Sequence, residues 1–321
     1  MKDAFYQAAT VLGDKLGSLI HSLPEQLAVH TEEISLRAGR SFTITSDRQT
    51  YFVKTTGGVV AEYRTGVYIP TVADMEEAFL NICDHSIHSR QADIRQGFVT
   101  VKGGHRAGIC GTAVKNDQNE ITALREISSI RLRIARFIEG VSRPLTGQLF
   151  RPNPVGLLIA GPPGSGKTTL LRDIAYSLAS AKAGRYYRVC VADERSELGG
   201  CFSGIPALLR APCCDLLDGY PKHLAIIQAT RSLCPEIILC DEIGTVEECD
   251  AVAAAVNSGV VMIASVHAGS REELLMRPQV RRLLGTGAFA YIVLLKGYDS
   301  NGIHFEIIGR SEYFRLLGVH E

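Results

Sequence analysis

The segment Gly161-Pro-Pro-Gly-Ser-Gly-Lys-Thr constrains this 321-residue chain more than any other feature. It fits the pattern GxxxxGK[ST], directly follows the apolar run VGLLIA and directly precedes the helix-like run KTTLLRDIAYSLAS. Glycines let such a loop curl until its backbone N–H groups face phosphate oxygens at the positive end of the next helix. The alternative is a Gly-rich turn before an ordinary helix, but strand, loop, Lys-Thr pair and helix all occur in register here. The sequence therefore predicts a phosphate-binding loop.

The loop and the residue after it are expected to contact a nucleotide, with ATP and Mg²⁺ as the ligands. The Lys167 ammonium would reach the β- and γ-phosphates, and the Thr168 hydroxyl would bind Mg²⁺. The full set of expected contact residues is Gly161, Pro162, Pro163, Gly164, Ser165, Gly166, Lys167, Thr168 and Thr169.

A site of this kind needs a strand that carries carboxylates beside the loop, and the run EIILCDE supplies one. Asp241 would complete the Mg²⁺ shell, and Glu242 would orient and deprotonate the attacking water. Taken alone, an acidic pair at a strand end is equally compatible with a solvated loop start. The preceding phosphate-binding loop favours the functional interpretation.

Two further candidates follow predicted strands. The acidic segment 193–197, DERSE, comes after the strand-like run RVCVA, and ligands of α/β sheets bind at the carboxyl ends of strands. One of its acids, Glu194 first, would face the γ-phosphate or its water; salt bridges with Arg195 or Arg172 are the alternative. His267 ends the run VVMIAS at the same edge, where it would contact the γ-phosphate or serve only as a satisfied polar residue.

Composition narrows the class of protein. Hydrophobic residues make up 46% and charged residues 21%, which is typical of a globular chain. The 34 basic and 34 acidic residues balance, so the chain lacks the global positive field of a protein held to nucleic acid through phosphates. The nine cysteines form no CxxC spacing and are odd in number, which argues against a disulfide framework and favours a reducing compartment.

Two apolar segments need a membrane test. The N-terminus lacks the basic start and unbroken apolar core of a signal peptide and is predicted to be one amphipathic helix. Residues 251–270 contain no Asp, Glu, Lys or Arg, and about 20 such residues could span a bilayer. Asn257-Ser258-Gly259 interrupts them, so we expect a buried helix followed by a strand.

The chain is expected to contain two domains. Residues 1–138 mix strand-like and helix-like runs and predict a small α+β domain. Residues 139–154 are rich in Gly and Pro and are predicted to form a linker. In residues 155–321 nearly continuous apolar strands alternate with helices, which predicts a parallel sheet covered on both faces; the last two strands are joined by a turn at Ser300-Asn301-Gly302.

Four segments resemble, in order, the signatures of the ATPases of type II and type IV secretion systems. They are GPPGSGKT, DERSEL, IILCDEIG and ASVHAGS, at the places of the Walker A motif, acidic box, Walker B motif and His box. Asp241-Glu242 stands where that family usually has Gly-Glu, and Arg231 lies one residue earlier than the family's arginine. The runs RQGFVTVKGGHRAGICGTAV and ISSIRLRIAR are more similar still to ATPases of endospore formation.

The resemblance implies an α/β, RecA-like P-loop ATPase domain preceded by a smaller α+β N-terminal domain. It implies an ATP-hydrolysing motor, a homo-hexamer that powers a membrane-embedded channel or secretion complex from mother cell to forespore. The expected partners are integral membrane proteins of that sporulation channel complex. The expected location is the mother-cell cytoplasm, peripheral to the membrane through these partners, and no nucleic acid is expected as a partner.

One strand-like run of the N-terminal half carries two candidate catalytic arginines. Period-two alternation in residues 129–134, SIRLRI, places Arg131 and Arg133 on one face of a strand and the aliphatic residues on the other. A solvated sheet face would show the same pattern. In secretion ATPases a similar strand delivers an arginine to the γ-phosphate, and Arg133 is the better match, with Arg131 second.

Two other classes of P-loop protein stay open on the residues alone. RecA-like cores also serve nucleic-acid-associated ATPases, although the balanced charge and the lack of Trp weigh against that function. A P-loop kinase would release a phosphorylated metabolite in place of free phosphate. The residues that could form a local basic face for nucleic acid are Arg90, Arg95, Lys102, His105 and Arg106.

Overall fold

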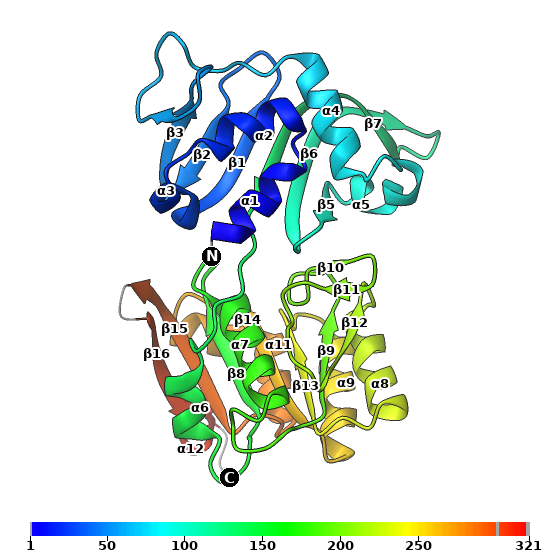
Figure 1. Ribbon diagram of the computed structural model, residues 1–321. Helices are drawn as coiled ribbons and strands as arrows, with labels where there is room; N and C mark the ends of the chain where they lie inside the picture. Colours follow the sequence, from blue (N-terminus) through cyan, green and yellow to red (C-terminus); the bar gives the residue numbers. More distant parts are fainter. Residues whose placement is uncertain (1, 300–301, 319–321) are drawn as a thin grey trace. The chain divides into compact units, whose positions relative to one another are not determined.

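The computed structural model describes residues 2–299 and 302–318 (Figure 1). The chain divides into two compact units. The first comprises Met1–Arg136 and Gly200–Ala207, and the second comprises Phe137–Gly199 and Leu208–Glu321. The first unit is therefore discontinuous in sequence, whereas the sequence pattern predicts one uninterrupted N-terminal domain.

The first unit is built on a sheet in which every pair of neighbouring strands is antiparallel. Its order is β4-β3-β2-β1-β7-β6-β5, and a separate hairpin is formed by β10 and β11. The strands are β1 (Thr31–Arg37), β2 (Thr43–Ser46), β3 (Gln49–Val53), β4 (Val59–Val60), β5 (Phe98–Val101), β6 (His105–Lys115), β7 (Ile121–Arg133), β10 (Cys201–Phe202) and β11 (Ile205–Pro206).

Helices of this unit pack on the sheet, with α1, α2 and α4 lying across its strands (Figure 1). The N-terminal segment forms two short helices, so the prediction of one amphipathic helix was wrong. The break falls at Gly13, whose φ of +86° is a left-handed conformation that a helix does not contain. The helices are α1 (Lys2–Thr10), α2 (Asp14–His21), α3 (Glu25–His30), α4 (Val72–Ile82), the 3₁₀ turn η1 (His88–Arg90) and α5 (Gln91–Arg95).

Strand β7 shows the alternation that its sequence predicts. Ile130 and Leu132 are buried in the core beneath the helices, whereas Arg131 and Arg133 are exposed on the other face. The Arg131 Nε lies 3.3 Å from Glu33 Oε1 on the neighbouring strand β1. Arg133 makes no ion pair or side-chain hydrogen bond within the described residues, so it is the freer of the two guanidinium groups.

The suggested local basic face loses one of its five members. His105 is completely buried, and burial lowers the pKa of its imidazole to about 4, so the ring is neutral at pH 7. Its Nδ1 accepts a hydrogen bond from the Ala135 backbone N–H at 3.1 Å. Arg106 stacks on the Phe98 ring, with 3.8 Å between the guanidinium carbon and the ring centroid. His105 is thus a core residue, and it adds no charge to this surface.

The second unit is the predicted α/β domain. Its sheet has the order β12-β9-β13-β14-β8-β15-β16, and all neighbours are parallel except β16, which pairs antiparallel with β15. Ser300 and Asn301 of the predicted turn Ser300-Asn301-Gly302 lie outside the described residues. The strands are β8 (Leu157–Gly161), β9 (Val189–Asp193), β12 (Cys214–Asp218), β13 (Ile237–Cys240), β14 (Val261–His267), β15 (Tyr291–Asp299) and β16 (Gly302–Gly309).

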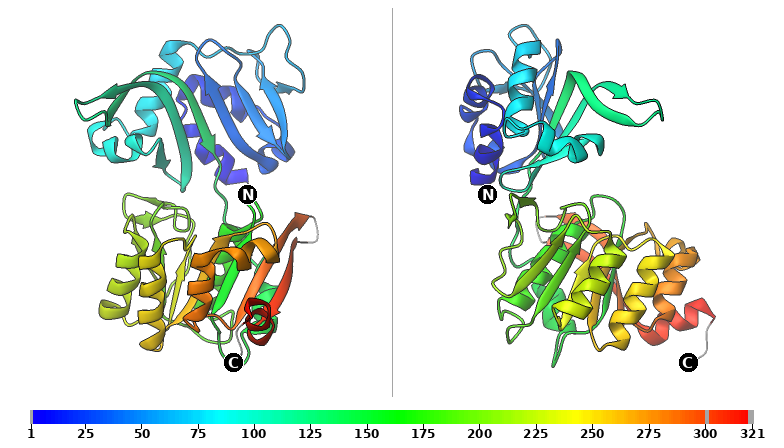
Figure 2. Two further views of the ribbon diagram at one scale, coloured as in Figure 1. Left: turned by 180° about the vertical axis from the view of Figure 1, so that it is seen from behind. Right: turned by 90° about the vertical axis from the view of Figure 1, so that its right-hand side faces the viewer.

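Helices cover both faces of this sheet, and each face has its own apolar core (Figure 2). Helices α6 and α7 pack on one face, and α8 to α12 pack on the other. Residues 251–270 fall in α9 and β14, so the predicted helix and strand are confirmed. The helices are α6 (Arg143–Leu149), α7 (Lys167–Ala179), α8 (Lys222–Ser232), α9 (Val246–Asn257), α10 (Arg271–Met276), α11 (Pro278–Gly285) and α12 (Arg310–Leu317).

Across residues 2–299 and 302–318, none of the helices combines the length and apolar character needed to cross a bilayer.

The segment expected as a linker, 139–154, contains helix α6. Its Leu145 and Leu149 are buried in the core beside α7. The carboxylate of Asp173 on α7 accepts hydrogen bonds from the Gly140 and Ser142 backbone N–H groups at 2.8 and 2.7 Å. Most of this segment is therefore packed into the second unit. The predicted domain boundary, after residue 138, lies two residues beyond the division after Arg136, and it stays a prediction.

Gly156, just before β8, provides a test of the packing of the second sheet. A Cβ atom at this position would lie 1.8 Å from the Ala288 carbonyl oxygen, which is a backbone atom that cannot rotate away. We expect Gly156→Ala to lower the free energy of unfolding by about 2–3 kcal/mol or more, because the two segments must separate. Chemical denaturation monitored by circular dichroism measures the change.

Gly147→Ala in α6 is the matched control, since a Cβ there meets no atom within 4 Å. Alanine favours a helix over glycine by about 0.5–1 kcal/mol, so this variant should be as stable as the parent or slightly more so. Equal stability of both variants would contradict the close approach of Gly156 and Ala288.

Candidate nucleotide-binding site

The strand order of the second unit brings the predicted signatures to one edge of the sheet. The phosphate-binding loop follows β8, and its neighbour β14 ends with His267 directly opposite Gly161. Beyond β14 lies β13, which Asp241 and Glu242 follow, and then β9, which the acidic segment follows. Parallel strands end at the same edge, so segments far apart in sequence meet there.

The loop has the tight curvature that its glycines predict. Gly164 and Gly166 have φ values of +72° and +94°, and Gly166 is the residue that precedes the first turn of α7. A Cβ atom on Gly161 would lie 2.5 Å from the buried Ser165 hydroxyl, so only glycine lets the loop fold over that side chain. The N-terminus of α7 therefore faces the centre of the loop, as an anion-binding site requires.

Lys167 lies within this loop. Its ammonium donates hydrogen bonds to the carbonyl oxygens of Gly161 at 2.9 Å and Pro162 at 3.1 Å, and it lies 3.0 Å from His267 Nδ1. Burial lowers the pKa of Lys167, and the carboxylates of Asp241 and Glu242 act in the opposite direction. The loop thus holds a cation at its centre.

His267 connects this cation to the predicted base. Because an ammonium can only donate, Nδ1 of His267 accepts from Lys167. The proton of the neutral ring then lies on Nε2, which is 2.5 Å from Oε1 of Glu242. The two contacts form a directed chain from Lys167 through His267 to Glu242. His267 therefore lies in the candidate site, where it contacts both Glu242, the predicted base, and the lysine of the phosphate-binding loop.

Thr168 and Asp241, the two expected Mg²⁺ ligands, lie close together. The Thr168 hydroxyl lies 3.3 Å from Asp241 Oδ2, and the Ser265 hydroxyl donates to Oδ1. Burial raises the pKa of Asp241, and the hydrogen bond from Ser265 opposes this effect. A hydroxyl beside a carboxylate is a set of hard oxygen donors that suits Mg²⁺. No group of three or more His, Cys, Asp or Glu side chains in the described part of the chain is arranged to hold a metal ion.

Glu242 has a strained backbone. Its φ of +46° is left-handed, which is rare for a residue with a side chain and is commonest at functional sites. Its backbone N–H donates to Ser265 Oγ at 3.0 Å, and its carbonyl accepts from Lys222 Nζ at 2.7 Å. The Arg195 guanidinium lies 3.8 Å from the other carboxylate oxygen of Glu242.

The acids of the acidic segment differ in their burial and in their hydrogen bonds. Asp193 is buried and accepts the backbone N–H groups of Glu197, Leu198 and Gly199 at 2.8–2.9 Å. Burial raises its pKa to about 6, and these hydrogen bonds limit the rise. Glu194 instead is about 41% exposed and lies 3.7 Å from Lys222 Nζ. Asp193 therefore shapes the loop. All three acids of the segment, Asp193, Glu194 and Glu197, line the hollow that also contains Asp241 and Glu242.

Arg172 on α7 holds the same loop from below. Its guanidinium donates to the carbonyl oxygens of Glu197 and Leu198, the latter at 3.1 Å. The carboxylates of Asp193, Asp241 and Glu197 also act on its charge and oppose the lowering of its pKa by burial.

Two residues of the candidate site, Ser265 and Lys222, were not predicted from the sequence. Ser265 could have been found, because it lies two positions before His267 and so shares its face of β14. Lys222 has no such signal, since its role depends on contacts with three segments. Arg131 and Arg133 belong to the first unit, and their catalytic role stays a prediction.

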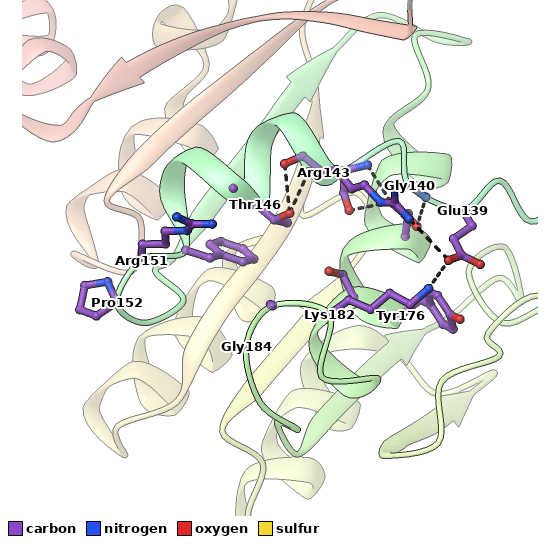
Figure 3. A pocket seen from close by; sticks show the side chains of 15 residues that line it. Glu139, Gly140, Arg143, Thr146, Arg151, Pro152, Tyr176, Lys182 and Gly184 are labelled. Atoms are coloured by element: carbon purple, nitrogen blue, oxygen red, sulfur yellow. Dashed lines mark hydrogen bonds and ion pairs between the residues drawn. The ribbon is translucent and has the colours of Figure 1, made fainter.

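A cavity of about 640 Å³ lies elsewhere in the second unit, between α6, the C-terminal half of α7 and the loop 182–184 (Figure 3). The Lys182 ammonium pairs with Glu139 there and lies 4.6 Å from the centre of the Tyr176 ring. Arg143 lies 3.9 Å from the same carboxylate. None of the residues of the phosphate-binding loop lines this cavity, so it is separate from the candidate nucleotide site.

The fold and the site define a P-loop protein with the RecA-like architecture of secretion ATPases. The ATPase DotB of Legionella pneumophila is 13% identical, with 91% of this chain and 80% of that chain covered and a TM-score of 0.55. The pilus retraction motor PilT, solved with bound ADP, is 14% identical, with 92% and 86% covered and a TM-score of 0.58. At these identities the likeness establishes the fold.

The chain belongs to the family described as sporulation stage III, protein AA, whose sequence model matches residues 10–310. It is 32% identical over 284 residues to the stage III sporulation protein AA of Bacillus subtilis, with 88% of each chain covered. The resemblance to sporulation ATPases seen in the sequence is thereby confirmed at the level of the family.

Lys167→Ala tests the phosphate-binding loop. The ammonium is the cation held at the centre of the loop, so its loss should weaken binding of ATP by at least about tenfold, the effect expected for a charge-assisted hydrogen bond. Fluorescence titration with a labelled ATP analogue measures the dissociation constant. Lys182→Ala, which lies outside the loop, should bind as the parent does. Unchanged affinity of Lys167→Ala would contradict the assignment.

Proposed function

We propose that this protein hydrolyses ATP as a motor of the secretion-ATPase type. The observation that carries the proposal is the contact chain from Lys167 through His267 to Glu242, with Thr168 and Asp241 beside it. It unites a phosphate-binding cation, a carboxylate base and a pair of metal-binding oxygens at one edge of the sheet. The RecA-like fold shared with DotB and PilT supports the same conclusion.

Each group of the chain has a separate task in hydrolysis. Lys167 neutralises the β- and γ-phosphate oxygens and orients them in the loop. Glu242 orients the attacking water and accepts its proton at the carboxylate. His267 fixes the direction of that carboxylate through Nε2. Thr168 and Asp241 would hold Mg²⁺, which would offset part of the negative charge of the phosphates.

The mechanical output is proposed to act on a membrane assembly. Membership of the sporulation family supports a role in endospore formation, in which a homo-hexamer would drive a channel complex from mother cell to forespore. The partners would be integral membrane proteins of that complex, and the chain would lie in the mother-cell cytoplasm, attached to the membrane through them.

Arg133 is the proposed source of additional positive charge at the γ-phosphate. It is exposed and without an ion pair in the described part of the chain, whereas Arg131 is paired with Glu33. In this hypothesis ATP clamps the two halves of the chain together, and hydrolysis releases them as the power stroke.

Glu242→Gln tests the hydrolytic assignment. The amide keeps the shape of the side chain but cannot accept the proton of water, so nucleotide binding should persist while hydrolysis falls by about 10²–10⁴-fold. Release of inorganic phosphate measures the rate, and the labelled ATP analogue measures binding. Glu247→Gln, an exposed neighbour on α9, is the control and should retain activity. Parental turnover by Glu242→Gln would move the base to Glu194.

Arg133→Ala tests the arginine hypothesis. Hydrolysis should fall by about 10³-fold or more while ATP affinity falls modestly, because an arginine of this kind acts on charge that develops in the transition state. Arg131→Ala should be milder, and Arg125→Ala, exposed on the same strand, should be unaffected. Native mass spectrometry first verifies that each variant assembles into the proposed homo-hexamer, and ATP turnover is then measured on that assembly. Normal turnover by a double Arg131/Arg133 variant would show that both arginines only face solvent.

A further inference from the structure

The backbone of Glu242 is held in place from both sides. A left-handed residue with a side chain keeps that conformation only where its surroundings enforce it. Ser265 Oγ accepts a hydrogen bond from the Glu242 backbone N–H, and Lys222 Nζ donates one to the Glu242 carbonyl oxygen at 2.7 Å. These two hydrogen bonds therefore fix the direction in which the carboxylate leaves the chain.

Lys222 makes more contacts than this hydrogen bond requires. It begins α8, its side chain is only 10% exposed, and Nζ lies 3.4 Å from Glu248 Oε1 and 3.7 Å from Glu194 Oε2. Glu248 is buried too, and it accepts the N–H groups of Gly244 and Thr245 at 2.7 and 2.9 Å in the capping box of α9. The Lys222 ammonium thus contacts the loop after β13, the acidic segment 193–197 and the first turn of α9.

The burial of this charge needs an explanation beyond packing. Removing an ammonium from water is costly, and an apolar side chain of similar length often packs as well or better. Glu248 and Glu194 offset the charge, but among these three side chains only the ammonium can donate to the Glu242 carbonyl. Position 222 therefore needs a side chain that can donate a hydrogen bond to the Glu242 carbonyl oxygen.

We propose that Lys222 is a positioning residue for hydrolysis. It holds the Glu242 carbonyl so that the residue stays left-handed and presents its carboxylate to His267. Its contact with Glu194 also connects the Glu242 backbone to the acidic segment 193–197. The inference rests on the proposed function, because it assumes that Glu242 is the base.

Lys222→Met tests the proposal through a split between kcat and KM. The ATP-contacting loop is untouched, so KM and the dissociation constant of the labelled ATP analogue should change by less than about threefold. The misplaced base should lower kcat by about 100-fold. Lys15→Met is the matched control: Lys15 also pairs with a buried carboxylate, that of Asp74 at 2.8 Å in the first unit, and its loss should leave kcat unchanged.

A second variant separates positioning from charge balance. Loss of Lys222 leaves Glu248 buried without its cation, which lowers stability for a reason unrelated to Glu242. The double variant Lys222→Met/Glu248→Gln removes that carboxylate charge and should recover the melting temperature but not the turnover. Recovery of turnover as well would show that Lys222 only neutralises Glu248, and it would overturn the inference. If the single variant does not fold, the double variant supplies the kcat and KM.

Comparison with Glu242→Gln separates this inference from the proposed function. If Glu242→Gln is inactive and Lys222→Met keeps parental turnover, the inference fails and the proposed function stands. If Glu242→Gln itself keeps parental turnover, the base assignment fails and the positioning role fails with it.

Discussion

The order of strands in the parallel sheet decides which side chains can meet at the phosphate-binding loop. β14 lies between β8, which leads into the loop, and β13, which leads into the acidic pair. Neighbouring strands are about 4.8 Å apart, so a side chain on the middle strand can contact both neighbours. His267 and Ser265 occupy that middle strand, and they hydrogen-bond to Lys167 on one side and to Asp241 and Glu242 on the other.

The charges of this site depend on one another. Burial lowers the pKa of Lys167 and raises that of Asp241, which means that each charge is costly alone. The carboxylates offset part of the cost of burying Lys167, and hydrogen bonds in such surroundings are stronger than in water. Lys222 and Glu248 form a second buried pair of opposite charge, with Nζ 3.4 Å from Oε1. Loss of any one group therefore leaves another without compensation.

Much of the second unit follows from local pattern. A strand covered on both faces must be apolar throughout, and this is why the runs in β8, β9, β13 and β14 were recognisable. The proposed catalytic side chains lie at the carboxyl ends of those runs, so their positions could be predicted from the strand ends. β12 was missed, because CDLLD contains two acids in five residues and lies at the edge of the sheet.

The remaining differences arise from contacts distant in sequence. Helix α6 lies within a Gly- and Pro-rich segment, and the carboxylate that anchors its start, Asp173, is about 30 residues further along the chain. Lys222 gains its role from Glu194, Glu242 and Glu248, none of which is its neighbour in sequence. No periodicity or motif carries such information, because it exists only after the chain has folded.

The hairpin of residues 200–207 has a consequence for dissecting the molecule. Because it belongs to the first unit while its flanks belong to the second, the polypeptide passes between the units three times, after residues 136, 199 and 207. A fragment that stops at residue 136 would lack Phe202, whose ring lies 5.2 Å from the guanidinium carbon of Arg90. The complementary fragment would carry the hairpin without the surface on which it packs. Neither unit can therefore be excised as one uninterrupted stretch of chain.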